Sequence, residues 1–148
     1  MSFFQGLKIS ASGLTAQRER MNVISSNLAN INTTRTPEGG PYRKKVVIFE
    51  AQPQKMDFEQ ILKGAGAKKK TLCGVMVREV READTPPRIV YDPNHPDADE
   101  LGYLAMPNVN MIEEMVDMLS ATRSYEANLT VIDDAKKMAM KAIEIGRS

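Results

Sequence analysis

Apolar residues recur at helical spacing in the first part of the chain, from Phe3 to about Ile31. One row returns every seventh residue, the spacing that keeps side chains on one face of a coiled coil. Glycines, serines and threonines lower the helix propensity of this segment, so the helix needs a partner surface to be stable. The first row contains Leu7, Leu14, Met21 and Leu28; the second contains Phe3, Ile24 and Ile31 and is interrupted by Ser10 and Gln17.

A second and better-marked helix is predicted from Met111 to Ile145. Asn110 suits the N-cap, Glu113 occupies the capping-box position, and Gly146 suits the C-terminal end. About 35 residues at ~1.5 Å each would form a rod of roughly 50 Å, which is long for a globular domain of this size. One row of its seam contains Met111, Met118, Tyr125, Ile132 and Ala139; the other contains Met115, Thr122, Leu129 and Ile143, with Lys136 as its one break.

The stretch between the two helices predicts short strands and turns, because β-forming residues alternate there with clusters of Pro, Gly, Asn and Asp. The segment Gln52–Lys70 shows neither the helical spacing of apolar residues nor the alternation typical of a strand, and it is rich in Gly, Ala and Lys. These features indicate a flexible loop with one short helical turn at Asp57–Leu62. The predicted strands are Tyr42–Glu50, Thr71–Glu82, Arg88–Tyr91 and Leu101–Leu104.

These elements predict an α+β protein in which the long N- and C-terminal helices pair as a coiled-coil-like stalk beside a small β-rich middle domain. The expected domains are residues 1–34, residues 35–106 with a flexible loop at 52–70, and residues 107–148. In the alternative, both helices pack on the β middle as one compact domain. Burying each Leu or Met of the seam stabilises by about 1.5–3 kcal/mol, and the short middle offers little apolar area, so the helices satisfy each other better.

Composition narrows the function classes. The formal net charge of +1 creates no broad field for nucleic acid or an anionic membrane. No run of about 18 apolar residues occurs, which argues against stable membrane insertion, and the first residues do not predict a cleaved signal peptide. Cys73 is the one cysteine; it cannot form an intramolecular disulfide and is expected to be a buried, inert thiol on a strand.

The turn around His95 is the strongest candidate for metal binding or catalysis. A calcium loop starting at Asp92 would need Gly at its sixth position and Glu at its twelfth, but Asp97 and Tyr103 stand there. A zinc site lacks further His or Cys ligands, and a Pro-rich turn is a poor platform for a Ser-His-Asp arrangement. The glycines near Lys68 do not follow the P-loop order. We therefore expect no enzymatic activity, no metal and no cofactor.

Two terminal stretches, Ser26–Thr33 and Glu114–Asn128, resemble the signatures of bacterial flagellar axial proteins, the family of rod, hook and hook-associated proteins. Asn32–Pro37 and three short motifs within Val90–Asn110 are similar to those of the proximal rod proteins in that family. The likeness covers nearly the whole chain, apart from the loop at 52–70. Each motif alone is weakly specific, but together they occur in the expected order.

The resemblance implies a structural subunit of the proximal flagellar rod, the drive shaft that crosses the periplasm. Such subunits leave the cytoplasm unfolded through the flagellar type III export apparatus, without a cleaved signal peptide. They assemble with copies of themselves and other proximal rod proteins, and they transmit torque. Two other readings stay open: a cytoplasmic coiled-coil adaptor, and a small metal-binding or enzymatic domain that uses the turn at 92–100.

The expected assembly interface lies on the seams and at the helix exit. Flexible Met side chains would let one surface meet different neighbours, and the asparagines would either cap the helix locally or bond across subunits. Arg123 and Glu126 are spaced to pair on one helix face. The candidates are Leu7, Leu14, Met21, Ile24, Asn27, Leu28, Asn30, Ile31, Asn32, Met111, Met115, Met118, Thr122, Arg123, Tyr125, Asn128, Leu129 and Ile132.

Overall fold

The computed structural model describes residues 3–52 and 73–146. The predicted helical turn at Asp57–Leu62 and nearly all of the predicted flexible loop lie outside the described residues. The elements, in chain order, are α1 (Phe3–Ala29), β1 (Lys45–Gln52), β2 (Gly74–Glu82), β3 (Arg88–Tyr91), β4 (Tyr103–Met106) and α3 (Met111–Ile145). The predicted α+β class, with long terminal helices in contact and a β-rich middle, is confirmed.

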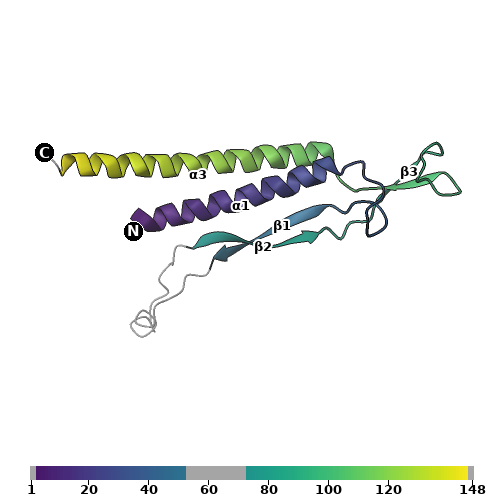
Figure 1. Cartoon of the computed structure of the whole chain (residues 1–148), viewed down its shortest axis with the longest axis horizontal. Helices are drawn as coiled ribbons and strands as arrows, with labels where there is room; N and C mark the ends of the chain where they lie inside the picture. The colour runs from purple at the N-terminus through teal and green to yellow at the C-terminus, as the bar shows by residue number, and fades with distance from the viewer. Residues whose placement is uncertain (1–2, 53–72, 147–148) are drawn as a thin grey trace, which may run out of the picture.

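Helix α1 is the central layer of the molecule (Figure 1). It packs against α3 on one side and against the β1–β2 hairpin on another, whereas α3 touches no other helix or strand among the described residues. The helices run antiparallel, so that Met21 meets Thr122 and Asn27 meets Glu114. Both termini therefore lie at one end of the molecule, and α3 extends past the start of α1 (Figure 1).

Small side chains set the close approach of the two helices. A Cβ atom at Gly13 would lie 3.0 Å from the Asn128 side chain, which is tighter than an ordinary van der Waals contact. Ala121 is completely buried, and Ala16 of α1 is buried as well. The alanines carry only a methyl group and Gly13 has no Cβ, so the surfaces of the two helices can lie close together. A larger residue at these positions would push the helices apart.

A polar contact fixes α1 to the β1–β2 hairpin. The Ser12 hydroxyl donates to the Ile9 carbonyl at 2.6 Å and accepts a hydrogen bond from the Val75 backbone N–H at 3.1 Å. Further along α1, the side chain of Val23 is buried as well. Of the two long helices, only α1 packs on the β middle. The alternative of one compact domain, in which both helices pack there, therefore does not describe α3.

The middle contains two separate antiparallel hairpins in the described residues, β1–β2 and β3–β4. In the first, Lys45 pairs with Glu82, and the register shifts at a bulge between Ile48 and Phe49. In the second, Val90 pairs with Leu104, which is buried. The strands at 88–91 and near 103 were predicted closely, but β4 begins at Tyr103 and not at Leu101.

Two predictions about the middle were wrong. Strand β1 begins at Lys45 and not at Tyr42, because the Tyr42 ring turns inward and its hydroxyl donates to Asn27. Cys73 is exposed and not buried, and β2 begins one residue later, at Gly74.

The apolar core is small. In the described ranges, the buried apolar residues are Ala16, Val23, Ile24, Tyr42, Leu104 and Ala121. Buried apolar area is the main favourable contribution to folding. The fold therefore depends strongly on the few close contacts that α1 makes with its two neighbours.

Replacing Ala121 with Leu should lower the free energy of unfolding by about 1–3 kcal/mol, because the added carbons must force α1 and α3 apart. The matched control is Ala127→Leu, since Ala127 is exposed on the same helix and its replacement should change stability by less than about 0.5 kcal/mol. Urea unfolding followed by circular dichroism measures both. Equal midpoints for the two variants would contradict close packing at Ala121.

Candidate assembly interface

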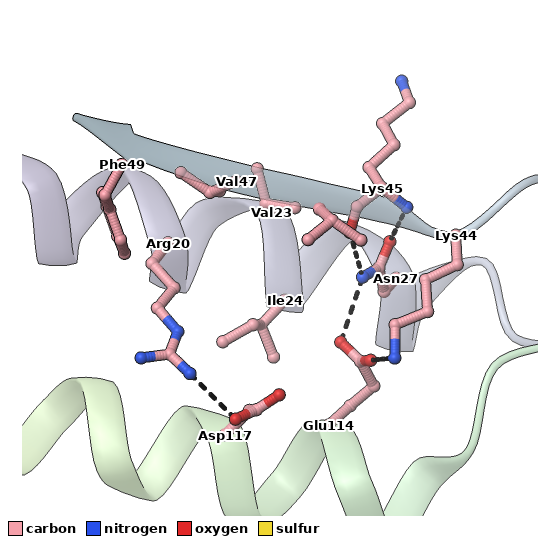
Figure 2. A pocket seen from close by; sticks show the side chains of 11 residues that line it. Arg20, Val23, Ile24, Asn27, Lys44, Lys45, Val47, Phe49, Glu114 and Asp117 are labelled. Carbon is pink, nitrogen blue, oxygen red and sulfur yellow. Dashed lines mark hydrogen bonds and ion pairs between the residues drawn. The ribbon is translucent and has the colours of Figure 1, made fainter. Parts of the chain in front are cut away.

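A buried polar cluster joins α1, α3 and the segment that enters β1 (Figure 2). Its centre is Glu114, on the first turn of α3, which is only 1% exposed. The Glu114 carboxylate forms an ion pair with the Lys44 ammonium at 2.7 Å and accepts a hydrogen bond from Asn27 Nδ2 at 3.0 Å. A buried carboxylate is tolerated only when charges and donors compensate for lost water, so these contacts fix where α3 begins relative to α1.

Asn27 satisfies its whole side-chain amide within the cluster. Its Nδ2 also donates to the Lys45 carbonyl at 2.9 Å, and its Oδ1 accepts from the Lys45 N–H at 2.9 Å and from the Tyr42 hydroxyl at 3.0 Å. Both donors and both acceptor positions are therefore used. Asn27 holds the first strand residue to the helix.

The other two asparagines predicted at the exit of the first helix differ from Asn27. Asn30 Nδ2 donates to the Ser26 carbonyl at 2.9 Å and its Oδ1 accepts from the Thr33 hydroxyl, which is local capping of the helix end. Asn32 is exposed. Together with Ile31 and Met111, Asn32 lines a hollow of about 400 Å³ where α1 ends and α3 begins.

A groove of about 360 Å³ lies beside the cluster. Its floor contains Val23 and Ile24 of α1, and Val47 and Phe49 of β1 form one wall (Figure 2). On the α3 side, Asp117 Oδ1 accepts from Arg20 at 2.8 Å. The groove is thus apolar at its base and charged at its rim.

Only the first of the two predicted rows of α3 faces α1, and it does so from Met118 onward, because Met111 is exposed. Met118, Tyr125 and Ile132 are half-buried there, as expected. The second inward row was predicted one residue too far along the helix: the buried or half-buried positions are Glu114, Ala121, Asn128 and Ala135. Met115 and Leu129 are exposed for this reason, although Thr122 is half-buried and its hydroxyl lies 3.7 Å from Met21 Sδ.

On α1 the predicted seam lies along the contact with α3. Ile24 is buried, and the seven-residue row is half-buried at all four of its positions, Leu7, Leu14, Met21 and Leu28. The predicted pairing of Arg123 with Glu126 does not form in the described residues, where both side chains are exposed.

An exposed apolar patch covers the outward side of the first turns of α3. We call it the α3 patch. Its spacing of i, i+1, i+4, i+5 and i+8 places its members on one face of the helix. The members are Met111, Ile112, Met115, Val116 and Leu119, which are 54%, 73%, 54%, 60% and 61% exposed.

The predicted seam includes Met111 and Met115 of the α3 patch but not its other three residues, and the predicted interface includes only Asn27 of the buried cluster. The i, i+4 spacing of Ile112 and Val116 was a readable signal for a second apolar face. Lys44 and Glu114 carry no such signal, because they are far apart in sequence and their pairing depends on the tertiary fold.

The His95 turn does not gather ligands for a metal. The His95 Nδ1 accepts a hydrogen bond from the Asp97 backbone N–H at 3.1 Å, which stabilises the turn. Within residues 3–52 and 73–146, no group of three or more His, Cys, Asp or Glu side chains could hold a metal ion. In the same ranges, no helix has the length and apolar character needed to cross a membrane.

Glu114→Ala should destabilise the fold by about 3 kcal/mol, because it leaves the half-buried Lys44 ammonium without its carboxylate and removes an acceptor from Asn27. Glu113→Ala is the matched control, since Glu113 is the exposed neighbour on the same turn. Chemical unfolding of both variants tests this. If Glu114→Ala lowered the free energy of unfolding no more than Glu113→Ala, the cluster would not hold α1, α3 and the segment before β1 together.

The chain matches two family models of flagellar rod proteins. The family model "Flagella basal body rod protein" matches residues 7–35, and the model "Flagellar basal body rod FlgEFG protein C-terminal" matches residues 100–145. The flagellar basal-body rod protein FlgC of Bacillus subtilis is 46% identical, over 99% of this chain and 100% of the relative. Those of Borreliella burgdorferi and Escherichia coli O6:H1 are 43% and 40% identical, over 98% and 99% of this chain and 98% and 100% of the relative. Because these identities extend over almost the whole of both chains, this chain belongs to the family of the flagellar basal-body rod protein FlgC.

Proposed function

We propose that this chain, a structural and non-enzymatic component of the flagellar basal-body rod, assembles through the α3 patch with copies of itself and with other proximal rod proteins. The proposal includes torque transmission along the periplasm-spanning rod and delivery through the flagellar type III export apparatus. It keeps the predicted division into residues 1–34, 35–106 and 107–148.

The α3 patch is the observation that carries the proposal. At the start of α3 the helix is apolar on two sides: Met118 and Ala121 face α1, while Ile112, Val116 and Leu119 face outward. A helix that is apolar on more than one side is normally covered on each of them. Each large side chain that is buried stabilises an interface by about 1.5–3 kcal/mol at most, so a neighbouring subunit would gain substantially by covering the patch.

The buried cluster supports the same proposal, because it holds the α3 patch in place before any partner arrives. Glu114 lies on the same helical turn as Ile112 and Met115, and the Arg20–Asp117 contact follows one turn later. A surface that is already ordered loses less conformational entropy on association. The same links connect the helices to the β1–β2 hairpin, as a rigid torque-bearing subunit requires.

The small core supports the proposed export route. A chain that must pass through a channel in an extended state benefits from a low free energy of unfolding, and the buried apolar residues in the described ranges are few. Apolar side chains that become buried only in the assembled rod would stabilise the rod without stabilising the free subunit. The subunit could then unfold easily for export and still form a stiff shaft.

Replacing Leu119 with Glu should abolish assembly, because a carboxylate placed in the centre of an apolar contact would be buried without a partner. Leu119 is 61% exposed in the single chain, so the helix content of the variant should not change. The readout is recovery of the chain with isolated basal bodies, in cells whose own copy of the gene has been deleted.

The matched control is Ser120→Glu, which introduces the same side chain on the same turn at an exposed position outside the α3 patch. It should assemble normally. Normal recovery of Leu119→Glu would contradict the proposed interface, and recovery of the wild-type chain only in the cytosol would favour the adaptor function.

Limited proteolysis of the purified monomer should cut first near both termini. The C-terminal turns of α3 extend past the start of α1 (Figure 1), and most of their residues are exposed. Ordering each residue costs about 1–2 kcal/mol of backbone entropy, which these turns offset with little burial. Mass spectrometry of the first fragments measures this, and early cleavage confined to the middle of the chain would contradict it.

A further inference from the structure

The edge of β1 that points away from β2 borders the groove beside the buried cluster. Across the β1–β2 ladder, the Ala83 N–H donates to the Lys44 carbonyl at 2.7 Å. Backbone groups of an antiparallel strand point alternately toward and away from the paired strand, so those of Lys45 and Val47 point away from β2. Both residues line the groove. We call their outward backbone groups the β1 edge.

The fold itself shows which chemistry the β1 edge accepts. At Lys45, the side-chain amide of Asn27 donates to the backbone carbonyl and accepts from the backbone N–H, both at 2.9 Å. A carboxamide offers the same donor and acceptor as a peptide group, so Asn27 takes the place of a residue in a third strand. Two residues further on, no group of the described residues bonds the outward N–H and C=O of Val47. An extended peptide would continue the pairing that Asn27 begins.

The groove beside this edge is apolar where such a peptide would lie. It runs between β1 and the first turns of α3, with α1 behind it (Figure 2). Val23 and Ile24 form its floor, and Phe49 on its wall is 37% exposed. The charged side chains that α1 and α3 contribute to its rim are already paired. Because side chains of a strand alternate between its two faces, an occupant needs an apolar residue at the position that faces the floor.

Strand β3 has a free edge with matching features. The Asp92 N–H donates to the Gly102 carbonyl at 2.9 Å, so the same alternation turns the backbone groups of Ile89 and Tyr91 away from β4. These two residues are spaced as Lys45 and Val47 are, and their side chains are 69% and 64% exposed. We call their outward backbone groups the β3 edge. It combines unpaired peptide groups with the apolar side chain that the groove requires.

The opposite edge of the same hairpin is closed by its own turn. The Tyr103 N–H donates to the Asp99 carboxylate at 2.8 Å, and the Tyr103 carbonyl accepts from the Asp99 N–H at 2.9 Å. The hairpin also projects from the end of the molecule opposite the termini, away from the helices (Figure 1). The β3 edge therefore lies away from the groove of its own chain and is placed to meet the groove of a neighbour.

We propose that β3 of a second copy of this chain adds to the β1 edge as a third strand. The backbone of Ile89 would bond that of Val47, as Asn27 bonds Lys45, and the Ile89 side chain would lie against Phe49. Because the two surfaces differ, the contact is head-to-tail and can be repeated from copy to copy. The inference rests on the proposed function, to which it adds a backbone contact separate from the apolar contact at the α3 patch.

The contact is short, since it pairs few residues on each strand. Interfaces much smaller than the roughly 1,200–2,000 Å² of stable complexes are weak, so this one would act together with the α3 patch. A test must capture it where the copies are neighbours, which photo-cross-linking in isolated basal bodies does.

The experiment places the photoreactive residue p-benzoylphenylalanine at Phe49, in cells whose own copy of the gene has been deleted. Illumination of their basal bodies should join two copies of the chain, and mass spectrometry should locate the junction within residues 88–91. Val46→p-benzoylphenylalanine is a second position on the groove, in case the first variant does not assemble. The control is the same substitution at Glu79 on the exposed face of β2, which should give far fewer joined copies.

A second substitution tests the backbone pairing itself. Adding Ile89→Pro removes an N–H that points away from β4, so the hairpin keeps its own ladder while the β3 edge loses a donor. The yield of joined copies should fall about fivefold, which corresponds to losing one hydrogen bond. Asp84→Pro, in the exposed segment before β3, is the matched control and should leave the yield unchanged.

The inference is overturned if the groove positions join copies no better than Glu79 does, or if the junction lies outside residues 88–91 or in another protein. It is also overturned if Ile89→Pro has no more effect than Asp84→Pro. Should any of these occur while Leu119→Glu still blocks recovery with basal bodies, the strand contact fails and the proposed function stands. If Leu119→Glu has no effect either, both fail.

Discussion

One buried carboxylate determines how the parts of this subunit are held together. Glu114 is almost completely removed from water, so the fold must supply the Lys44 ammonium and the Asn27 amide at the same point. Asn27 in turn fixes the first residue of β1 through both backbone atoms of Lys45. Helix, helix and hairpin are therefore joined through a single connected network, and none of its members can move without leaving a buried polar group unsatisfied.

This way of joining the elements suits a chain with a small apolar core. Polar networks are specific in geometry but contribute modest net stability, because their desolvation cost offsets much of the gain. Apolar burial contributes more, and in this molecule much of the available apolar surface lies outside on α3, with Ile112, Val116 and Leu119 exposed. The arrangement separates shape from stability: the cluster determines the shape of the subunit, and contact with neighbours would supply further stability.

The sequence predicted the elements better than the contacts between them. Helix α3 has the predicted bounds because Asn110 caps it, with its side chain accepting from the Ile112 N–H. The two long helices and the β middle follow from periodicity, which is a local property. The partners of Glu114 could not be read in the same way, since Lys44 precedes it by 70 residues and no pattern links them. The burial of Cys73 was predicted wrongly because the sequence of a strand does not show which elements cover it.

The error in the second α3 row shows what decides the packing of such a helix. Met115 and Leu129 continue a seven-residue pattern as well as Ala121 and Asn128 do, and apolar spacing alone favours the larger side chains. The contact with α1 instead selects the smaller ones, because Gly13 and Asn128 approach too closely for a bulky residue and Glu114 must reach Asn27. Rotating the helix by one residue to bury Met115 would remove Glu114 from its partners. The contact between Glu114 and Asn27 that positions α3 on α1 therefore also turns the larger apolar side chains of α3 outward. Packing within the chain and the apolar surface available to neighbouring subunits thus have the same cause.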